Sequence, residues 1–468
     1  MTPLGYIMLL AGLAGLLFSK KWLYRFFVFW TLFSASSAAN FGEGENASAL
    51  QIWMLFGCLW LLRELYESFT VFSFSLDRRI ARPAVWLIAF LFVASISLIM
   101  PAYINGSLMI ASSQLGDQSA TPLYLTQHNF TQLLYLIFGI SIAICVSQMN
   151  LDDEVKHDTE RTILFSALFI ALWGLLQFGC NLSGLPYPDY IFNNSESVSG
   201  KGFLETLNGV GRISSVATEP SLFAQSLVTL LPLTFPAWLK TGFVVSRRFD
   251  RSCAVLFLIL LVLCTSSTAY LGLFLLAILA VLMFRRTGAL SVGKALVRAL
   301  ALGALLILAA AIAISTLPVV RDVMTSTLLT KSSSGSALER LMTVELAFGY
   351  FQKYPLLCIG WGSATSHDLF IKLLSNVGIV GTLLFVGAVF SVIRAGWRAL
   401  RPLALPTDLS RVAWLLSLLV FVLTAVFSGF PLAFGNFWLT LGMAMSVGWK
   451  PDLAQAQLST AHHIECSQ

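Results

Sequence analysis

Long apolar runs, separated by short polar segments, extend over most of the chain. A run of about 17 to 25 apolar residues makes a helix long enough to cross a hydrocarbon core of roughly 30 Å. We therefore expect an all-α fold, a polytopic bundle of about 12 to 13 transmembrane helices. The thirteen candidate spans lie at about 3–19, 22–39, 47–65, 83–104, 130–149, 162–182, 219–239, 253–267, 269–284, 295–318, 369–393, 411–429 and 432–448.

The composition indicates a membrane protein. Of the 468 residues, 57% are hydrophobic and 11% are charged, and the mean hydropathy is +0.81. An ordinary soluble domain carries roughly 25% charged residues, so these values exclude a water-soluble globule. The net charge of +6 is spread over short loops. It therefore reflects orientation in a membrane rather than binding of nucleic acid.

Basic clusters orient the helices, because lysine and arginine concentrate in cytoplasmic loops. The clusters at 247–251 and 285–294 must share one side, so the apolar region between them is predicted to cross twice, with a turn near 264–270. This orientation puts the N-terminus outside and the C-terminus inside. The clusters expected in the cytoplasm lie at 20–25, 78–82, 247–251, 285–294 and 394–401.

The domain organisation follows from these spans. We expect one integral membrane domain over 1–450 and a disordered cytoplasmic tail over 451–468. Two long loops, at about 183–218 and 319–368, fall on the exterior side. Loops of this length in a compact protein are usually either functional or disordered. They also carry most of the exterior cations, so candidate chemistry is expected there.

The second loop contains the stretch SSSGSALERLMTVELAFGYFQKYP at 332–355. Its capping pattern, apolar face and terminal proline predict a helix lying near the membrane surface. Arg340 would then stand on a fixed scaffold. An arginine in solvent, or one paired with Glu339 or Glu345, is the alternative reading.

The loop ends at His367, the exterior start of the next span. A histidine there can be neutral near pH 7, and it can then accept a proton from a hydroxyl nucleophile. Asp368 is a candidate to tune the ring, although adjacent helical residues do not face each other, and Lys372 lies within the helix start. An interfacial histidine without a role is the alternative. Gly378 and Gly381, further along the same helix, are expected to permit close helix packing.

The first loop leads through Arg212 into a helix beginning near Glu219 and Pro220. A proline in the first turn and an acid at the N-terminus are ordinary helix-start signals. The same position, at the membrane edge beside an exterior arginine, also suits a catalytic or substrate-holding carboxylate. Both readings stay open.

Two exterior arginines and one histidine, without a metal-ligand cluster, suit one class of substrate. A lipid-linked pyrophosphate needs planar cationic groups for its oxygens, a base for an incoming hydroxyl and an apolar surface for its tail. The sequence has no Walker A or GxGxxG motif. We therefore expect no metal or nucleotide cofactor.

These residues resemble the O-antigen ligase and polymerase family, bacterial inner-membrane glycosyltransferases of the GT-C class. The family signature is His, then Asn, Ser or Gln, nine residues, Gly, two residues, and Gly, Thr or Tyr. Here His367 and Asp368 are followed by nine residues, Gly378, two residues and Gly381. Asp368 departs from the uncharged residue usual at that position. Arg340, some way before His367, also matches, and the resemblance is strongest over about 205–390.

The resemblance implies a reaction. His367 would activate the acceptor hydroxyl, Arg340 and Arg212 would hold the pyrophosphate, and Glu219 would position the acceptor or an arginine. The substrate would be a glycan on undecaprenyl pyrophosphate, and transfer would be inverting, metal-independent and periplasmic. Membrane lipid, a chain-length regulator and a flippase are the partners it implies.

The segment Glu219-Pro220-Ser221 is more similar to polysaccharide polymerases than to ligases, so a polymerase is the first expectation. A ligase that delivers the finished glycan to lipid A-core is its closest alternative. A flippase or transporter for the same lipid-linked sugars is the alternative of another class. A transporter should carry ionisable residues near the middle of the membrane. Here the apolar spans are nearly free of charge, so a transporter is disfavoured.

Overall fold

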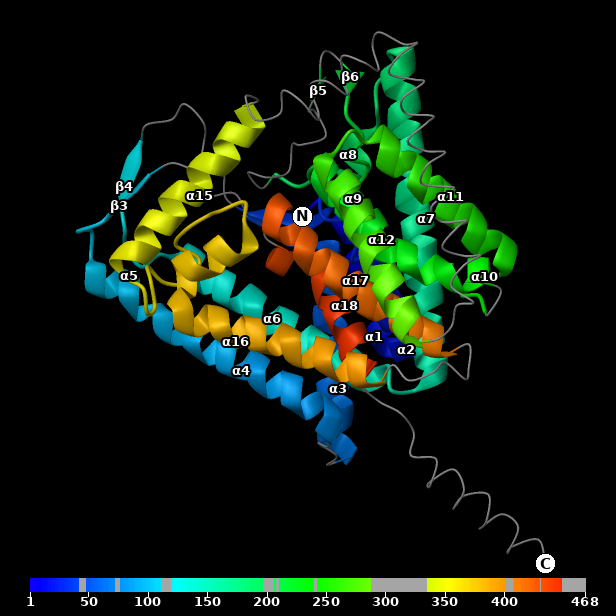
Figure 1. The fold of residues 1–468 in the computed structure, drawn as a ribbon, viewed down its shortest axis with the longest axis horizontal. Coiled ribbons are helices and arrows are strands. Elements are labelled where there is room, and N and C mark those ends of the chain that lie inside the picture. Colours follow the sequence, from blue (N-terminus) through cyan, green and yellow to red (C-terminus); the bar gives the residue numbers. More distant parts are fainter. Residues whose placement is uncertain are drawn as a thin grey trace, which may run out of the picture.

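The computed structural model describes residues 1–41, 48–71, 76–111, 119–196, 206–207, 210–239, 242–287, 335–399, 407–429 and 431–447. This part of the chain is mostly helical (Figure 1). Six helices in it are long and apolar enough to cross a membrane, and two shorter helices, Pro3–Phe18 and Ser267–Met283, are also apolar. The protein is therefore a multi-pass helical membrane protein. The six spans are Ile80–Ile104, Gln127–Met149, Asp153–Ser183, Pro220–Leu239, Leu369–Ala399 and Ser410–Ser428.

The elements follow the chain in a simple order. The α-helices are α1 (Pro3–Phe18), α2 (Lys20–Trp30), α3 (Ile52–Val71), α4 (Arg78–Ser97), α5 (Ile99–Ile104), α6 (Gln127–Met149), α7 (Asp153–Ser183), α8 (Asp189–Phe192), α9 (Pro220–Leu230), α10 (Phe235–Leu239), α11 (Arg247–Leu263), α12 (Ser267–Thr287), α15 (Gly335–Lys353), α16 (Leu369–Ala399), α17 (Thr407–Ser428) and α18 (Gly435–Ser446). Two 3-10 helices, η3 (Leu231–Thr234) and η6 (Pro431–Ala433), adjoin α9 and α18.

Three small antiparallel hairpins accompany the helices, and the apolar pattern did not predict them. They pair β1 (Ser37–Phe41) with β2 (Ser48–Gln51), β3 (Met109–Ala111) with β4 (Ala120–Pro122), and β5 (Thr206–Leu207) with β6 (Val210–Gly211). The last two lie in segments that were expected to be loops. The first shortens two predicted spans, because β1 replaces the end of 22–39 and β2 replaces the start of 47–65.

The predicted span 22–39 is wrong in its second half. Helix α2 ends at Trp30, and the chain continues as strand β1. The Ser36 hydroxyl donates to the Phe192 carbonyl (2.6 Å), and the Ser37 amide donates to Asn194 Oδ1 (2.8 Å). The Ser37 amide thus bonds to a side chain of a distant loop, where a continuous helix would have given it a carbonyl of the preceding turn.

The span predicted at 47–65 begins on β2 and continues as α3. The other predicted spans fall mainly on helical segments, except 295–318, which lies outside the described residues along with the tail 451–468. The predicted pair of short crossing helices is present as α11 and α12. The turn between them contains Thr265, whose φ is 49°. The helix predicted within 332–355 is α15.

Two sets of contacts define the ends of the bundle. At one end, Arg25 of α2 pairs with Asp158 of α7 at 2.5 Å, and Lys20 lies 2.9 Å from both Glu64 and Glu67 on α3. The basic cluster 20–25 therefore sits at the end where α2 begins.

At the opposite end, the chain beyond α2 meets the segment that leads into α9. The Ala35 amide donates to the Val216 carbonyl (3.0 Å), and the Thr218 amide donates to Ser34 Oγ (3.3 Å). We call this end, where the chain enters α9 and α16, the site end.

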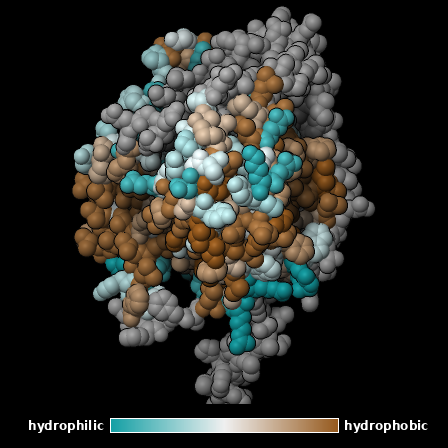
Figure 2. Space-filling view, turned by 90° about the vertical axis from the view of Figure 1, so that its left-hand side faces the viewer, coloured by the Kyte–Doolittle hydropathy of each residue, from teal (hydrophilic) through white to brown (hydrophobic). Residues whose placement is uncertain are grey.

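An apolar surface surrounds the bundle between the two ends. Helices α4 and α16 pack along each other (Figure 1) and expose Val85, Phe92, Leu383 and Phe390 outward. Figure 2 shows this side of the molecule as a broad hydrophobic band, with hydrophilic side chains above and below it. Such a band is what lipid chains cover.

Helix α16 breaks at Gly378, where φ is 64° and ψ is −166°. The amide of Ile379 donates to the Pro355 carbonyl (2.9 Å) across this break. A Cβ on Gly378 would stand 2.0 Å from the Leu356 carbonyl oxygen. Gly378 was expected to allow close helix packing. The structure assigns it a sharper role, because only glycine fits both the backbone angle and the passing loop.

Candidate active site at the start of helix α16

Five of the six candidate residues are linked to the start of α16, because Asp368 adjoins His367 in the sequence and three charged residues act on the His367 ring. The charges of Arg340, Glu219 and Lys372 all act on the ring of His367. Arg340 lies on α15 and Glu219 immediately precedes α9, whereas Lys372 lies in the first turn of α16. The two long loops and the start of α16 therefore contribute to one site, although these residues are up to about 150 positions apart in the sequence.

His367 is half-buried between α15 and α16. Its Nδ1 lies 3.1 Å from the Thr343 hydroxyl. Burial lowers the pKa of His367 below its ordinary 6.5, and the positive charges of Arg340 and Lys372 lower it further, while Glu219 acts in the opposite direction. The imidazole is therefore neutral at neutral pH, as a general base must be.

Arg340 points from α15 toward the end of α17. Its Nη1 donates to the Phe427 carbonyl at 3.4 Å. Among the described residues, no ion pair joins Arg340 to Glu339 or Glu345, the pairing that was the alternative reading. One carbonyl bond leaves the remaining donors of the guanidinium for another acceptor.

Glu219 occupies the N-cap position of α9, but its carboxylate does not cap the helix. Its Oε2 instead accepts a hydrogen bond from the Ser221 hydroxyl (2.9 Å). The backbone carbonyl of Glu219 accepts from the amides of Leu222 and Phe223, both at 3.1 Å. The Glu219 carboxylate therefore bonds to a side chain in the first turn of α9, and its charge acts on the ring of His367.

Asp368 caps helix α16. Its Oδ1 accepts a hydrogen bond from the Ile371 amide (2.9 Å), and its amide donates to Ser366 Oγ (3.3 Å). Burial raises the pKa of the Asp368 carboxyl, and the backbone amides that it accepts from partly offset this effect. Asp368 therefore stabilises the first turn of α16, directly after His367, through a hydrogen bond to the helix backbone.

Arg212 lies in a different contact network. Its Nη2 donates to the Thr265 carbonyl (3.3 Å) in the turn between α11 and α12, and Cys264 and Tyr270 are its electrostatic neighbours. Two residues on, the amide of Ser214 donates to Gln177 Oε1 (2.9 Å). The described contacts of Arg212 thus run to α11 and α12, whereas those acting on His367 come from α15, α9 and α16.

A hydrogen-bonded frame holds the chain just before His367, and sequence reasoning did not single out its residues. Asn376 Oδ1 accepts from the amides of Ser363 (3.0 Å) and Ala364 (3.2 Å). Asn129 Nδ2 donates to the Trp361 carbonyl (2.8 Å). Asn376 and Asn129 are buried. Asn376 is a polar residue inside the predicted apolar span 369–393, which is the signal that would have found it, whereas Asn129 directly precedes the span predicted at 130–149.

Gly360, in the same segment before His367, packs closely against Ser97 and Pro101. Its φ is 94°, and an added Cβ would stand 2.5 Å from Pro101 Cδ and 2.8 Å from the Ser97 carbonyl oxygen. The bend that returns the chain from α15 to α16 thus presses against the end of α4. This contact fixes where His367 emerges.

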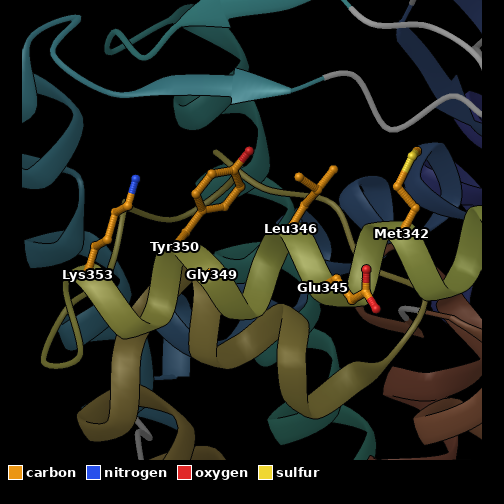
Figure 3. A pocket seen from close by; sticks show the side chains of 6 residues that line it. All are labelled: Met342, Glu345, Leu346, Gly349, Tyr350 and Lys353. Atoms are coloured by element: carbon orange, nitrogen blue, oxygen red, sulfur yellow. The ribbon is translucent and has the colours of Figure 1, made fainter.

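A groove lies along the face of α15 that looks toward the β3–β4 hairpin (Figure 3). Its volume is about 340 Å³. Met342, Leu346 and Tyr350 line its length, and Glu345 and Lys353 supply its charges. The Tyr350 hydroxyl accepts a hydrogen bond from the Ala111 amide (3.0 Å). The hairpin therefore anchors one wall of a surface that shares its helix with Arg340.

No cluster of three or more potential metal ligands is found in the part of the chain that the structure describes. The chain matches no protein-family model, and no curated protein sequence matches it either.

Proposed function

We propose that the protein is a polysaccharide polymerase of the bacterial inner membrane with a GT-C-like bundle of about 12 to 13 spans. It transfers a glycan from undecaprenyl pyrophosphate to a hydroxyl group of a lipid-linked repeat unit at the periplasmic face. The observation that carries the proposal is that His367, held by Thr343 of α15 at the start of α16, lies within the electrostatic reach of Arg340, Glu219 and Lys372 at one end of an apolar bundle.

In this reaction His367 accepts the proton of the acceptor hydroxyl as its oxygen attacks the anomeric carbon of the donor sugar. A new glycosidic bond forms, and the bond from the anomeric carbon to the pyrophosphate oxygen breaks. Attack opposite the leaving group inverts the configuration. The electron pair leaves with undecaprenyl pyrophosphate, and the proton passes from His367 to that product or to water. No metal or nucleotide is required for this balance.

The cations stabilise the negative charge that grows on the leaving pyrophosphate. Arg340 offers guanidinium donors beyond the one used by Phe427. Lys372 adds a second charge beside His367. Arg212, on the α11–α12 side, is assigned to the pyrophosphate by the resemblance. Glu219 positions the acceptor or orients a cation, and Asp368 holds the start of α16 beside the substrate.

The apolar parts of the protein suit the rest of the substrate. A polyprenyl chain is soluble only in the bilayer, and the exposed apolar faces of α4 and α16 lie beside the bilayer. The groove on α15 opens on the helix that carries Arg340. We assign to it the sugars that follow the reacting unit, with Glu345 and Lys353 as hydrogen-bonding groups for glycan hydroxyls.

The test uses purified protein in lipid nanodiscs with undecaprenyl-pyrophosphate-linked repeat units as the only substrate. A polymerase produces a ladder of products, and the ladder persists when a chelator removes divalent ions. A ligase leaves the repeat units unchanged until lipid A-core is added, and a flippase moves them across a sealed bilayer without joining them. Unchanged substrate under all these conditions refutes the glycosyltransferase.

A further inference from the structure

The Thr343 hydroxyl touches two groups in the candidate site. Its Oγ1 lies 2.9 Å from the carbonyl oxygen of Arg340, one turn earlier in α15, and 3.1 Å from Nδ1 of His367. A hydroxyl group has one hydrogen to donate and two lone pairs to accept with. A carbonyl oxygen can only accept. The hydrogen of Thr343 is therefore placed on the bond to Arg340.

The second contact then fixes the proton on the histidine. With the Thr343 hydrogen used by the Arg340 carbonyl, Oγ1 presents a lone pair to His367, so Nδ1 must carry a hydrogen and donate it. A neutral imidazole has one N–H group, which leaves Nε2 unprotonated. Thr343 is only 1% exposed. Water therefore does not compete for this hydroxyl.

The helix favours the same arrangement. A threonine inside an α-helix commonly donates to the carbonyl three or four residues earlier, because one staggered rotamer aims the hydroxyl there. Helix α15 is anchored on both sides of Thr343. Arg340, before it, donates to the Phe427 carbonyl, and Tyr350, after it, accepts from the Ala111 amide. The ring of His367 is thus oriented by a rigid element that also carries a cation of the site.

We propose that Thr343 is a positioning residue that holds neutral His367 protonated on Nδ1, so that Nε2 is the atom that accepts the proton of the acceptor hydroxyl. The role of Nε2 as a base rests on the proposed function. The tautomer itself does not, because it follows from the two contacts of Thr343. Backbone, hydroxyl and ring form one relay of hydrogen bonds.

The experiment is ¹⁵N NMR of histidine-labelled protein in nanodiscs, above the pKa of His367, at about pH 8. Protonated and unprotonated ring nitrogens differ widely in ¹⁵N chemical shift. The signals of His367, one of five histidines, are those missing from the spectrum of the His367→Gln variant. We expect the His367 ring to be protonated on Nδ1 in the native protein and in Thr343→Ser. In Thr343→Val, which keeps the volume but lacks the acceptor, both tautomers should appear.

Turnover is measured on the same three proteins. We expect Thr343→Val to lower kcat about tenfold with little change in the acceptor KM, and Thr343→Ser to restore kcat, since general bases contribute about 10²- to 10⁴-fold in all. Protonation on Nε2 in the native protein, or an unchanged tautomer in Thr343→Val, overturns the inference even if the polymerase is active. An inactive native protein with the expected tautomer instead overturns the proposed function alone.

Discussion

The break in α16 at Gly378 offers the sharpest mechanical test of the site. Alanine at this position would be placed at φ 64° and ψ −166°, a region essentially restricted to glycine, at a cost of about 1 to 3 kcal/mol. Its Cβ would also stand 2.0 Å from the Leu356 carbonyl oxygen. Relieving such an overlap costs about 1 to 3 kcal/mol more. The total is about 2 to 6 kcal/mol.

This strain should displace the segment that leads to His367. The Ile379 amide bonds to the Pro355 carbonyl at 2.9 Å across the break, so the helix and the loop cannot both keep their places in Gly378→Ala. A middle value of about 4 kcal/mol corresponds to an increase of roughly 1,000-fold in the ratio of displaced to native loop. We therefore expect kcat to fall at least tenfold.

Cys358 reports the displacement directly. It is fully buried in this loop, and burial raises the pKa of its thiol to about 12. Alkylation needs the thiolate, so Cys358 in the native protein should react very slowly at neutral pH. In Gly378→Ala the rate of alkylation, followed by mass spectrometry of the peptide, should rise by orders of magnitude.

Gly179→Ala is the matched control, because an added Cβ there meets nothing within 4 Å. It should leave both the turnover and the reactivity of Cys358 unchanged. If Gly378→Ala behaves like this control in both assays, the reasoning from the broken helix is refuted.

Three further predictions concern the charges and the groove. His367→Ala should lower turnover about 10²- to 10⁴-fold in the ladder assay. The native kcat/KM should fall with acid only below pH 6.5, where the imidazole of His367 becomes protonated. Glu219→Gln removes the charge that raises the pKa of His367, so the midpoint of this pH profile should move lower, and an unmoved midpoint would place Glu219 outside the site. Arg340→Lys keeps the charge but loses the planar fork, so kcat should fall about tenfold, and native turnover in this variant would exclude a pyrophosphate contact there. Gly349→Trp fills the groove and should raise the acceptor KM, whereas Gly349→Ala, whose Cβ meets nothing within 4 Å, should not; equal KM values would remove the groove from the glycan path.

The spans were predictable because each depends on its own composition. The runs at 130–149 and 369–393 match α6 and α16 closely, since burial in lipid selects any apolar segment of sufficient length. The prediction for 22–39 was wrong in its second half, because long-range contacts decide the structure there. Its serines found partners in a loop more than 150 residues away, such as Ser36 on Phe192, and no local pattern records such a partner.

The candidate site divides in a similar way. Residue type and position marked His367, Arg340 and Glu219 as able to accept a proton, bind an anion and carry a negative charge. Thr343 and Asn376 were not marked. Thr343 stands three residues after Arg340, and so on the same side of the helix, but this spacing has meaning only once His367 is known to lie against that side.

The amino-acid sequence by itself determines that this chain is a helical membrane protein with its ionisable groups concentrated between apolar segments. It can do so because hydropathy and charge act locally. Its tertiary structure decided which of those groups meet. The bond from Arg340 to the Phe427 carbonyl joins residues 87 positions apart, and Arg212 lies against the α11–α12 turn. These contacts depend on how distant helices pack, and packing is a property of surfaces that exist only after folding.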